Sequence, residues 1–81
     1  MSIWFKEYNV DDIVTENTMV EHLGIKITEL GEDYIVGTMP VDNRTKQPFG
    51  ILHGGASVAL AETLASYGGY LTIDSEKYHV V

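Results

Sequence analysis

The sequence predicts one small α+β domain in which antiparallel strands pack against a single long helix. Residues 48–73 form a long apolar run that carries only one formal charge, on Glu62. Before this run, residues 24–30 show the residue alternation that is typical of a β-strand, and residues 34–41 form a second predicted strand. The chain has 81 residues, which allow a single domain with a modest core.

Two short helices are expected ahead of the first strand. Residues 11–17 have the apolar spacing of a short amphipathic helix. Thr18 and Glu21 then have the spacing of a capping box, with Thr18 as N-cap and Glu21 as the third helical residue. A second short helix should therefore follow Thr18 and end near residues 22–24.

The two strands should pair as an antiparallel hairpin. In residues 24–30 isoleucines alternate with polar side chains, which predicts one apolar face and one wet face. Residues 31–33 form the turn. Pro40 indicates that the second strand ends there or runs along a sheet edge, because proline cannot donate a ladder hydrogen bond.

The long helix should begin at Gly54 and Gly55, which precede a run of strong helix formers. Because the run is apolar nearly all round, the helix should be buried. At 100° per residue, small residues and Glu62 share one side of the helix. The bulky side, which should fill the core, consists of Leu60, Leu64, Tyr67 and Leu71.

The end of the chain is expected to leave the sheet incomplete. Residues 74–76 should form a turn, and residues 77–81 begin a new β pattern. Two strands and the start of a third are too few to cover an apolar helix of this length. We therefore expect residues 1–81 to be one domain that is incomplete at its C-terminal end, either a fragment or part of a longer protein.

Composition restricts the class of function. A formal net charge of −7 argues against nucleic-acid binding, which needs a basic face. The absence of cysteine excludes disulfides and thiolate zinc sites and fits a reducing compartment. His22 and His79 are isolated, so no metal is expected. The N-terminus lacks the pattern of a signal peptide, and no apolar segment reaches spanning length, which predicts a cytoplasmic protein without membrane contact.

Residues 40–63, P-V-D-N-R-T-K-Q-P-F-G-I-L-H-G-G-A-S-V-A-L-A-E-T, resemble the hotdog-fold acyl-CoA thioesterases. The branch in question acts on aromatic acyl-CoAs such as 1,4-dihydroxy-2-naphthoyl-CoA and 4-hydroxybenzoyl-CoA. The likeness starts near Trp4 and covers the chain, but only somewhat more than half of a family domain. It implies the N-terminal portion of an antiparallel sheet wrapped around one long helix. It also implies a homodimer or a dimer of dimers, and no dissociable cofactor.

The resemblance implies roles for five residues. Glu62 matches the catalytic carboxylate, which acts as general base on water or as nucleophile. Gly54 matches the residue whose backbone N–H polarises the thioester carbonyl. His53 and Gln47 match polar residues that flank the thioester, and Ser66 matches a hydroxyl that assists near the carboxylate. The implied reaction is hydrolysis of an acyl-CoA to the free acid and coenzyme A.

The residues themselves support this chemistry and leave alternatives open. A partly buried glutamate can activate water or attack a carbonyl, and burial raises its basicity, but Glu62 could equally be satisfied by a backbone donor or a partner chain. Gly54 and Gly55 offer N–H donors at a helix N-terminus, which suits an oxyanion and a bound substrate, or they mark a plain turn. His53 fits a helix cap as well as a substrate contact.

Weaker candidates surround this set. Ser66 could contact Glu62 or bond the preceding turn of its own helix. Gln47 fits an exposed loop amide unless the motif is considered. Phe49 could line an acyl pocket or pack in the core. Arg44 and Lys46 could meet the phosphates of coenzyme A, or lie in a solvated loop.

The spacing of Gly54 and Glu62 predicts a site shared between chains. Eight residues of helix separate them by about 12 Å, too far for both to reach one carbonyl carbon. Two antiparallel helices, each offering its N-terminus to the middle of the other, bring the groups together twice in a twofold dimer. The competing interpretations are a hydratase or dehydratase of the same fold, which would pair an acid with a histidine, and an inactive folding or interaction unit.

Overall fold

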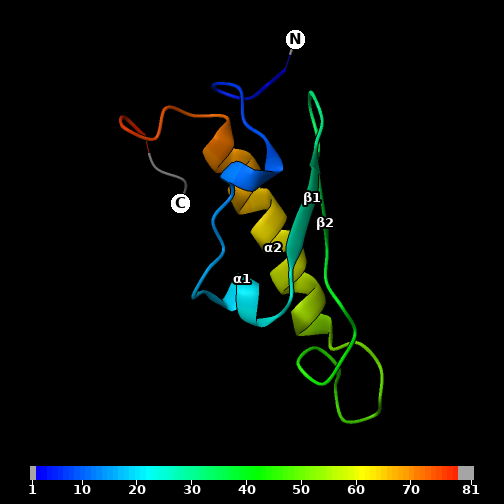
Figure 1. Ribbon diagram of the computed structural model, residues 1–81. Coiled ribbons are helices and arrows are strands. Elements are labelled where there is room, and N and C mark those ends of the chain that lie inside the picture. The colour runs from blue at the N-terminus through cyan, green and yellow to red at the C-terminus, as the bar shows by residue number, and fades with distance from the viewer. Residues whose placement is uncertain (1, 79–81) are drawn as a thin grey trace.

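The computed structural model describes residues 2–78 and has the predicted α+β architecture. A long helix crosses the molecule beside a two-stranded hairpin, and the N-terminal segment lies over the C-terminal end of that helix (Figure 1). In chain order the elements are the 3-10 helix η1 (Val10–Asp12), α1 (Met19–His22), β1 (Lys26–Leu30), β2 (Ile35–Thr38) and α2 (Gly54–Leu71).

The hairpin confirms the two predicted strands and the turn between them. β1 and β2 pair antiparallel, from Lys26 opposite Thr38 to Leu30 opposite Ile35. The register shifts by one residue between Ile27 and Glu29, which is a β-bulge that bends β1. Both strands are shorter than predicted, and β2 ends two residues before Pro40, as a residue without an N–H requires.

Helix α2 lies against the hairpin through its bulky side, as the helical wheel predicts. Gly37 of β2 makes this approach possible, since a β-carbon placed there would lie 2.6 Å from Leu64 Cδ2. One turn further on, a β-carbon at Gly68 would lie 3.9 Å from Ile35 Cγ2. Leu71 is buried at the end of the helix with 4 % of its surface exposed.

The prediction that α2 is buried all round is wrong for this chain. Within the helix only Thr63 and Leu71 are buried, whereas Val58 is 66 % exposed and Glu62 also lies in solvent. The reason is geometric: two strands cover one side of an 18-residue helix and leave the other side open.

The helix expected over residues 11–17 is also wrong. Only the 3-10 turn η1 forms, capped by Asn9, and Ile13 ends it in an extended conformation with φ −88° and ψ 114°. Tertiary contacts then draw the segment out: the Tyr67 hydroxyl donates a hydrogen bond of 2.8 Å to the Val14 carbonyl.

Helix α1 begins where the sequence predicts. Thr18 is its N-cap, and the Thr18 hydroxyl accepts from the Glu21 N–H at 3.5 Å. The return bond of the capping box goes elsewhere, because the Glu21 carboxylate accepts from the N–H of Asn17, not of Thr18, at 3.4 Å. Asn17 has a φ of 62°, which places its N–H toward the helix.

The N-terminal segment joins the hairpin turn to the end of α2. Trp4 Nε1 donates to the Gly31 carbonyl at 2.7 Å, and the Phe5 N–H donates to the Leu71 carbonyl at 2.8 Å. After α2, Asp74 accepts from the backbone of Lys77 and forms the predicted turn.

The β pattern expected over residues 77–81 has no strand in its described part, and residues 79–81 lie outside the described residues. Over the part of the chain that the structure describes, no helix has both the length and the apolarity needed to cross a membrane.

Candidate active site

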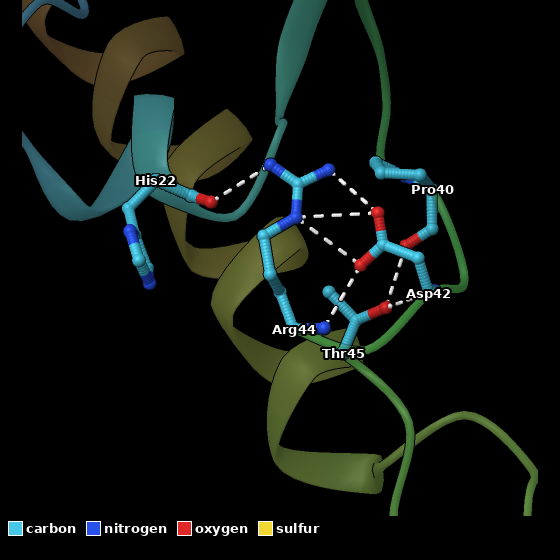
Figure 2. A network of polar contacts seen from close by, with 5 residues as sticks. All are labelled: His22, Pro40, Asp42, Arg44 and Thr45. Atoms are coloured by element: carbon cyan, nitrogen blue, oxygen red, sulfur yellow. Dashed lines mark hydrogen bonds and ion pairs between the residues drawn. The ribbon is translucent and has the colours of Figure 1, made fainter.

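The segment between β2 and α2 is anchored by a buried threonine (Figure 2). Thr45 is 1 % exposed, and its hydroxyl donates to the Pro40 carbonyl at 2.6 Å while accepting from the Asp42 N–H at 3.0 Å. The Asp42 carbonyl in turn accepts from the N–H groups of Thr45 and Lys46, both at 3.0 Å. These bonds close a tight turn directly after the hairpin.

Arg44 ties this turn to the rest of the molecule. Its Nη2 donates to Asp42 Oδ2 at 2.6 Å, and its Nη1 donates to the His22 carbonyl at the end of α1 at 2.9 Å (Figure 2). The hydrogen bonds from Arg44 lower the pKa of the Asp42 carboxyl, and the same contact raises the pKa of Arg44. The Arg44 guanidinium is therefore already bonded to groups of its own chain, which argues against Arg44 as a ligand for the phosphates of coenzyme A.

A narrow loop then leads from Thr45 to the start of α2. The His53 N–H donates to the Thr45 carbonyl at 2.8 Å, and the Gln47 N–H donates to the Ile51 carbonyl at 2.8 Å. Within the loop, the Gln47 side-chain oxygen accepts from the Phe49 N–H at 2.5 Å. Phe49 itself is 89 % exposed, so it packs in no core here and stays a candidate for contacting substrate.

His53 is the N-cap of α2. Its Nδ1 accepts from the Gly55 N–H at 2.8 Å, and its carbonyl accepts from the N–H groups of Ala56 and Ser57 at 3.0 and 3.2 Å. Among the described residues, no group accepts a hydrogen bond from the Gly54 N–H. A β-carbon at Gly54 would meet nothing within 4 Å, so the donor lies at an open helix mouth.

Glu62 and Ser66 form a pair in the middle of α2. The Ser66 hydroxyl donates to Glu62 Oε1 at 2.8 Å, so Ser66 contacts the carboxylate rather than the backbone of the preceding turn. The backbone bond is made instead by Thr63, whose hydroxyl donates to the Ala59 carbonyl at 2.7 Å. Glu62 remains exposed, so in this chain the serine, and not burial, holds the carboxylate in place.

The candidate residues thus form two separate groups within one chain. Gln47, His53 and Gly54 lie at the mouth of α2, and Glu62 with Ser66 lies eight residues further along the helix, about 12 Å away. Neither of two hollows of about 590 Å³, one at the hairpin tip and one beside Arg44, is lined by Glu62. The candidate catalytic carboxylate therefore lies outside both surface hollows.

Thr45 is the positioning residue that the sequence interpretation missed. The run D-N-R-T, residues 42–45, contains the aspartate and threonine that commonly close such turns, and this signal could have identified it. In the described part of the chain, no three His, Cys, Asp or Glu residues are grouped to hold a metal ion, and His79 lies outside that part.

The chain is similar to proteins named as thioesterases. It is 58 % identical over 72 residues to the proofreading thioesterase EntH of Cronobacter sakazakii, a match that covers 86 % of this chain and 53 % of that protein. It is 51 % identical over 77 residues to a putative esterase of Haemophilus influenzae, with 93 % and 56 % covered. No protein-family model matches the chain.

Solved structures agree with these relatives. The crystal structure of thioesterase HI1161 from Haemophilus influenzae superimposes with a TM-score of 0.85 at 51 % identity, covering 89 % of this chain and 52 % of that one. A glutamine-to-alanine variant of thioesterase PA1618 from Pseudomonas aeruginosa gives a TM-score of 0.87 at 39 % identity, with 93 % and 55 % covered. The chain spans about half the length of the curated relatives that it matches. By sequence and by fold, the chain is therefore similar to about half of each of these thioesterases, and its α+β architecture is that of a partial hotdog fold.

Proposed function

We propose that this protein is a thioesterase that hydrolyses an acyl-CoA to the free acid and coenzyme A. The observation that carries the proposal is the hydrogen bond between Ser66 and Glu62, which fixes a carboxylate on the open side of a helix that begins with a free N–H. Identity above 50 % to proteins named as a thioesterase and an esterase supports the same reaction class.

The proposed chemistry uses Glu62 in one of two ways. As general base, the carboxylate takes a proton from the water whose oxygen bonds to the acyl carbon. As nucleophile, it bonds to that carbon itself, and water then hydrolyses the resulting anhydride. In both cases the C–S bond breaks. In the first, the protonated Glu62 returns its proton to the leaving sulfur; in the second, coenzyme A leaves as the thiolate and takes up the proton that hydrolysis of the anhydride releases. The Gly54 N–H stabilises the negative charge on the carbonyl oxygen, while Gln47 and His53 help to hold the thioester.

We further propose that each site combines two chains. Gly54 and Glu62 are separated by about 12 Å along α2, yet both must approach one thioester carbon. Both are exposed in the single chain, so an antiparallel neighbour could bring its own α2 against them. A twofold homodimer, alone or within a dimer of dimers, then contains two equivalent sites.

An aromatic acyl group is the substrate that the resemblance favours over a fatty chain. A hydratase or dehydratase is less well supported, because such an enzyme would place a histidine beside the acid. Here the group beside Glu62 in the chain is the Ser66 hydroxyl, and the Nδ1 of His53 is engaged in capping α2, where it accepts from the Gly55 N–H.

The reaction is tested by thiol release from a panel of aromatic and aliphatic acyl-CoAs. We expect Glu62→Gln to lower kcat by about 10²- to 10⁴-fold, because the amide can neither accept the proton nor attack the carbonyl. We expect the highest kcat/KM with an aromatic acyl group. Equal rates for the wild-type chain and the Glu62→Gln variant would remove the assignment of Glu62 and with it the proposed mechanism.

The role of the Gly54 N–H as the oxyanion donor is tested by a substitution that removes this N–H. Proline at the first helical position lacks the N–H yet suits a helix start, and His53 already has the extended conformation, φ −71° and ψ 129°, that precedes proline. We expect Gly54→Pro to lower kcat by about 10²- to 10³-fold with α2 intact by circular dichroism. Gly54→Ala is the matched control: it keeps the N–H and adds a methyl group into open space.

A further inference from the structure

The first turn of α2 uses its N–H groups unequally. A helix begins with four N–H groups that have no partner within the helix. In α2 three of them bond to His53, one through the ring and two through the carbonyl, and the fourth, on Gly54, is free among the described residues. One residue therefore determines which donor the helix mouth offers.

The second glycine of the motif fits the histidine ring. A β-carbon at Gly55 would lie 2.9 Å from His53 Nδ1 and 3.0 Å from Cε1, so any side chain there would push the ring off the helix mouth. Because Nδ1 accepts the Gly55 N–H, it carries a lone pair, and the ring proton must be on Nε2. The cap is therefore a neutral imidazole of one defined tautomer.

The same helix mouth is free of negative charge. Acidic residues are favoured in the first turn of a helix, and they are present in the first turns of η1 and α1. The first turn of α2 has none, although the chain has 12 acidic residues and only five lysines and arginines. A carboxylate cap would bond the Gly55 N–H equally well, but its charge would repel an oxyanion at Gly54.

We propose that His53 is a positioning residue that caps α2 without charge, leaves the Gly54 N–H as the single donor, and requires glycine at position 55. The catalytic part of this inference rests on the proposed thioesterase reaction, in which an oxyanion develops beside Gly54. The structural part, the tautomer and the fit between the ring and Gly55, is independent of any reaction.

Two variants of His53 separate the effect of capping α2 from the effect of a negative charge at the cap. His53→Asn and His53→Asp both supply a side-chain oxygen that can cap the helix, so both should fold with similar Tm values. We expect kcat of the aspartate variant to be on the order of ten- to a hundredfold below that of the asparagine variant, with little difference in KM, because the charge acts on the transition state. Equal kcat values in the two variants would overturn the charge argument.

The structural part is tested without an enzyme assay. In ¹⁵N-histidine NMR spectra of the wild-type chain we expect the His53 ring to show an unprotonated Nδ1 and a protonated Nε2; a protonated Nδ1 would overturn the cap. Gly55→Ala should lower Tm in the wild type but not in the His53→Asn background, where no ring meets the new methyl group. The same loss of Tm in both backgrounds would contradict the fit between His53 and Gly55.

These measurements distinguish the two proposals. If the wild-type chain releases no thiol but the NMR and Tm results are as expected, the proposed reaction fails and the structural part of the inference stands. If Glu62→Gln abolishes thiol release but the ring has the other tautomer, the reaction stands and the inference fails.

Discussion

Asp42 shows how a single half-buried residue can position a distant site. Its carbonyl closes the turn that buries Thr45, and its carboxylate holds Arg44, which reaches the end of α1. The Thr45 carbonyl then accepts from the N–H of His53, and His53 is the residue that caps α2. A change at Asp42 can therefore reach the helix mouth through two hydrogen-bonded steps.

The contact between Asp42 and Arg44 predicts a pH dependence of stability. The side-chain and backbone hydrogen bonds from Arg44 lower the pKa of Asp42 below its ordinary value of 3.8. The unfolded chain therefore binds this proton at higher pH than the folded chain does, so the stabilisation is present above pH 3.8 and is lost as pH falls through the folded pKa. We expect the Tm of Asp42→Asn to lie below that of the wild type at pH 6 and the difference to shrink as pH falls below about 4.

The control removes the partner. In an Arg44→Met background the carboxylate loses the side-chain hydrogen bond, which is the largest cause of its lowered pKa, but keeps the hydrogen bond from the backbone N–H of residue 44. The effect of Asp42→Asn on Tm should therefore vary less with pH than it does in the wild-type background. Thermal unfolding followed by circular dichroism measures both pairs. A pH dependence of the same size without the Arg44 side chain would show that the guanidinium is not the main cause of the lowered pKa of Asp42.

Among the secondary-structure elements, the contact between β2 and α2 depends on a glycine in the strand. A β-carbon at Gly37 would lie 2.6 Å from Leu64 Cδ2 and 3.1 Å from the Lys26 carbonyl oxygen. The leucine can rotate, but the backbone oxygen cannot move without disturbing the pairing of β1 and β2. We expect Gly37→Ala to lower the free energy of unfolding by about 1–3 kcal/mol, measured by urea denaturation.

Gly68 offers a control for this change on the opposite side of the same interface. A β-carbon there would contact Ile35 Cγ2 at an ordinary 3.9 Å, and alanine is a better helix former than glycine. Gly68→Ala should therefore raise the free energy of unfolding by about 0.5–1 kcal/mol. Destabilisation by both changes would mean that α2 packs more closely on the hairpin than the structure shows.

Elements with strong local signals could be predicted from the sequence. The alternation of residues 24–30, the turn at residues 31–33 and the helix start at Gly54 each follow from neighbouring residues, and the structure confirms them. Residues 11–17 could not be predicted in this way. Only a 3-10 turn forms there, and the Val14 carbonyl is bonded to the Tyr67 hydroxyl, 53 residues away, a contact that no local pattern reveals.

The same distinction applies to the candidate site. The adjacency of Glu62 and Ser66 follows from helical spacing, and the capping role of His53 was one of two alternatives. The exposure of Glu62 could not be predicted, because it depends on which elements cover α2. A helix that is apolar on all sides needs elements packed around it, but its sequence does not reveal which chain supplies them.

At the scale of the whole molecule, exposed apolar surface is the dominant feature. Ile25 and Leu71 are the buried hydrophobic residues of the described chain. By contrast, a larger set of hydrophobic side chains is largely exposed, and on or beside α2 it comprises Phe49, Ile51, Val58 and Tyr70. Apolar surface next to Gly54 and Glu62 is the surface that the proposed twofold partner would cover, which makes the shared site testable by mixing chains.

Chains with complementary defects should restore activity if the sites are shared. A Gly54→Pro chain keeps its Glu62, and a Glu62→Gln chain keeps its Gly54, so each mixed dimer contains one intact site and one doubly defective site. Random exchange makes half of the dimers mixed, and the thiol-release rate should recover to about a quarter of the wild-type rate. Sites confined to one chain would instead give only the average of the two residual rates.

A second mixture distinguishes the two arrangements from the opposite direction. When the wild-type chain is mixed equally with a chain that carries both Gly54→Pro and Glu62→Gln, every shared site in a mixed dimer has one defect. The rate should then fall to about a quarter of the wild-type rate, because only pure wild-type dimers remain active. Confined sites would leave about half of it, since each wild-type chain would keep its own complete site. A quarter in both mixtures would establish that α2 of one chain supplies the carboxylate and α2 of its partner supplies the donor, whereas about half in this mixture, with no recovery in the other, would contradict the shared site.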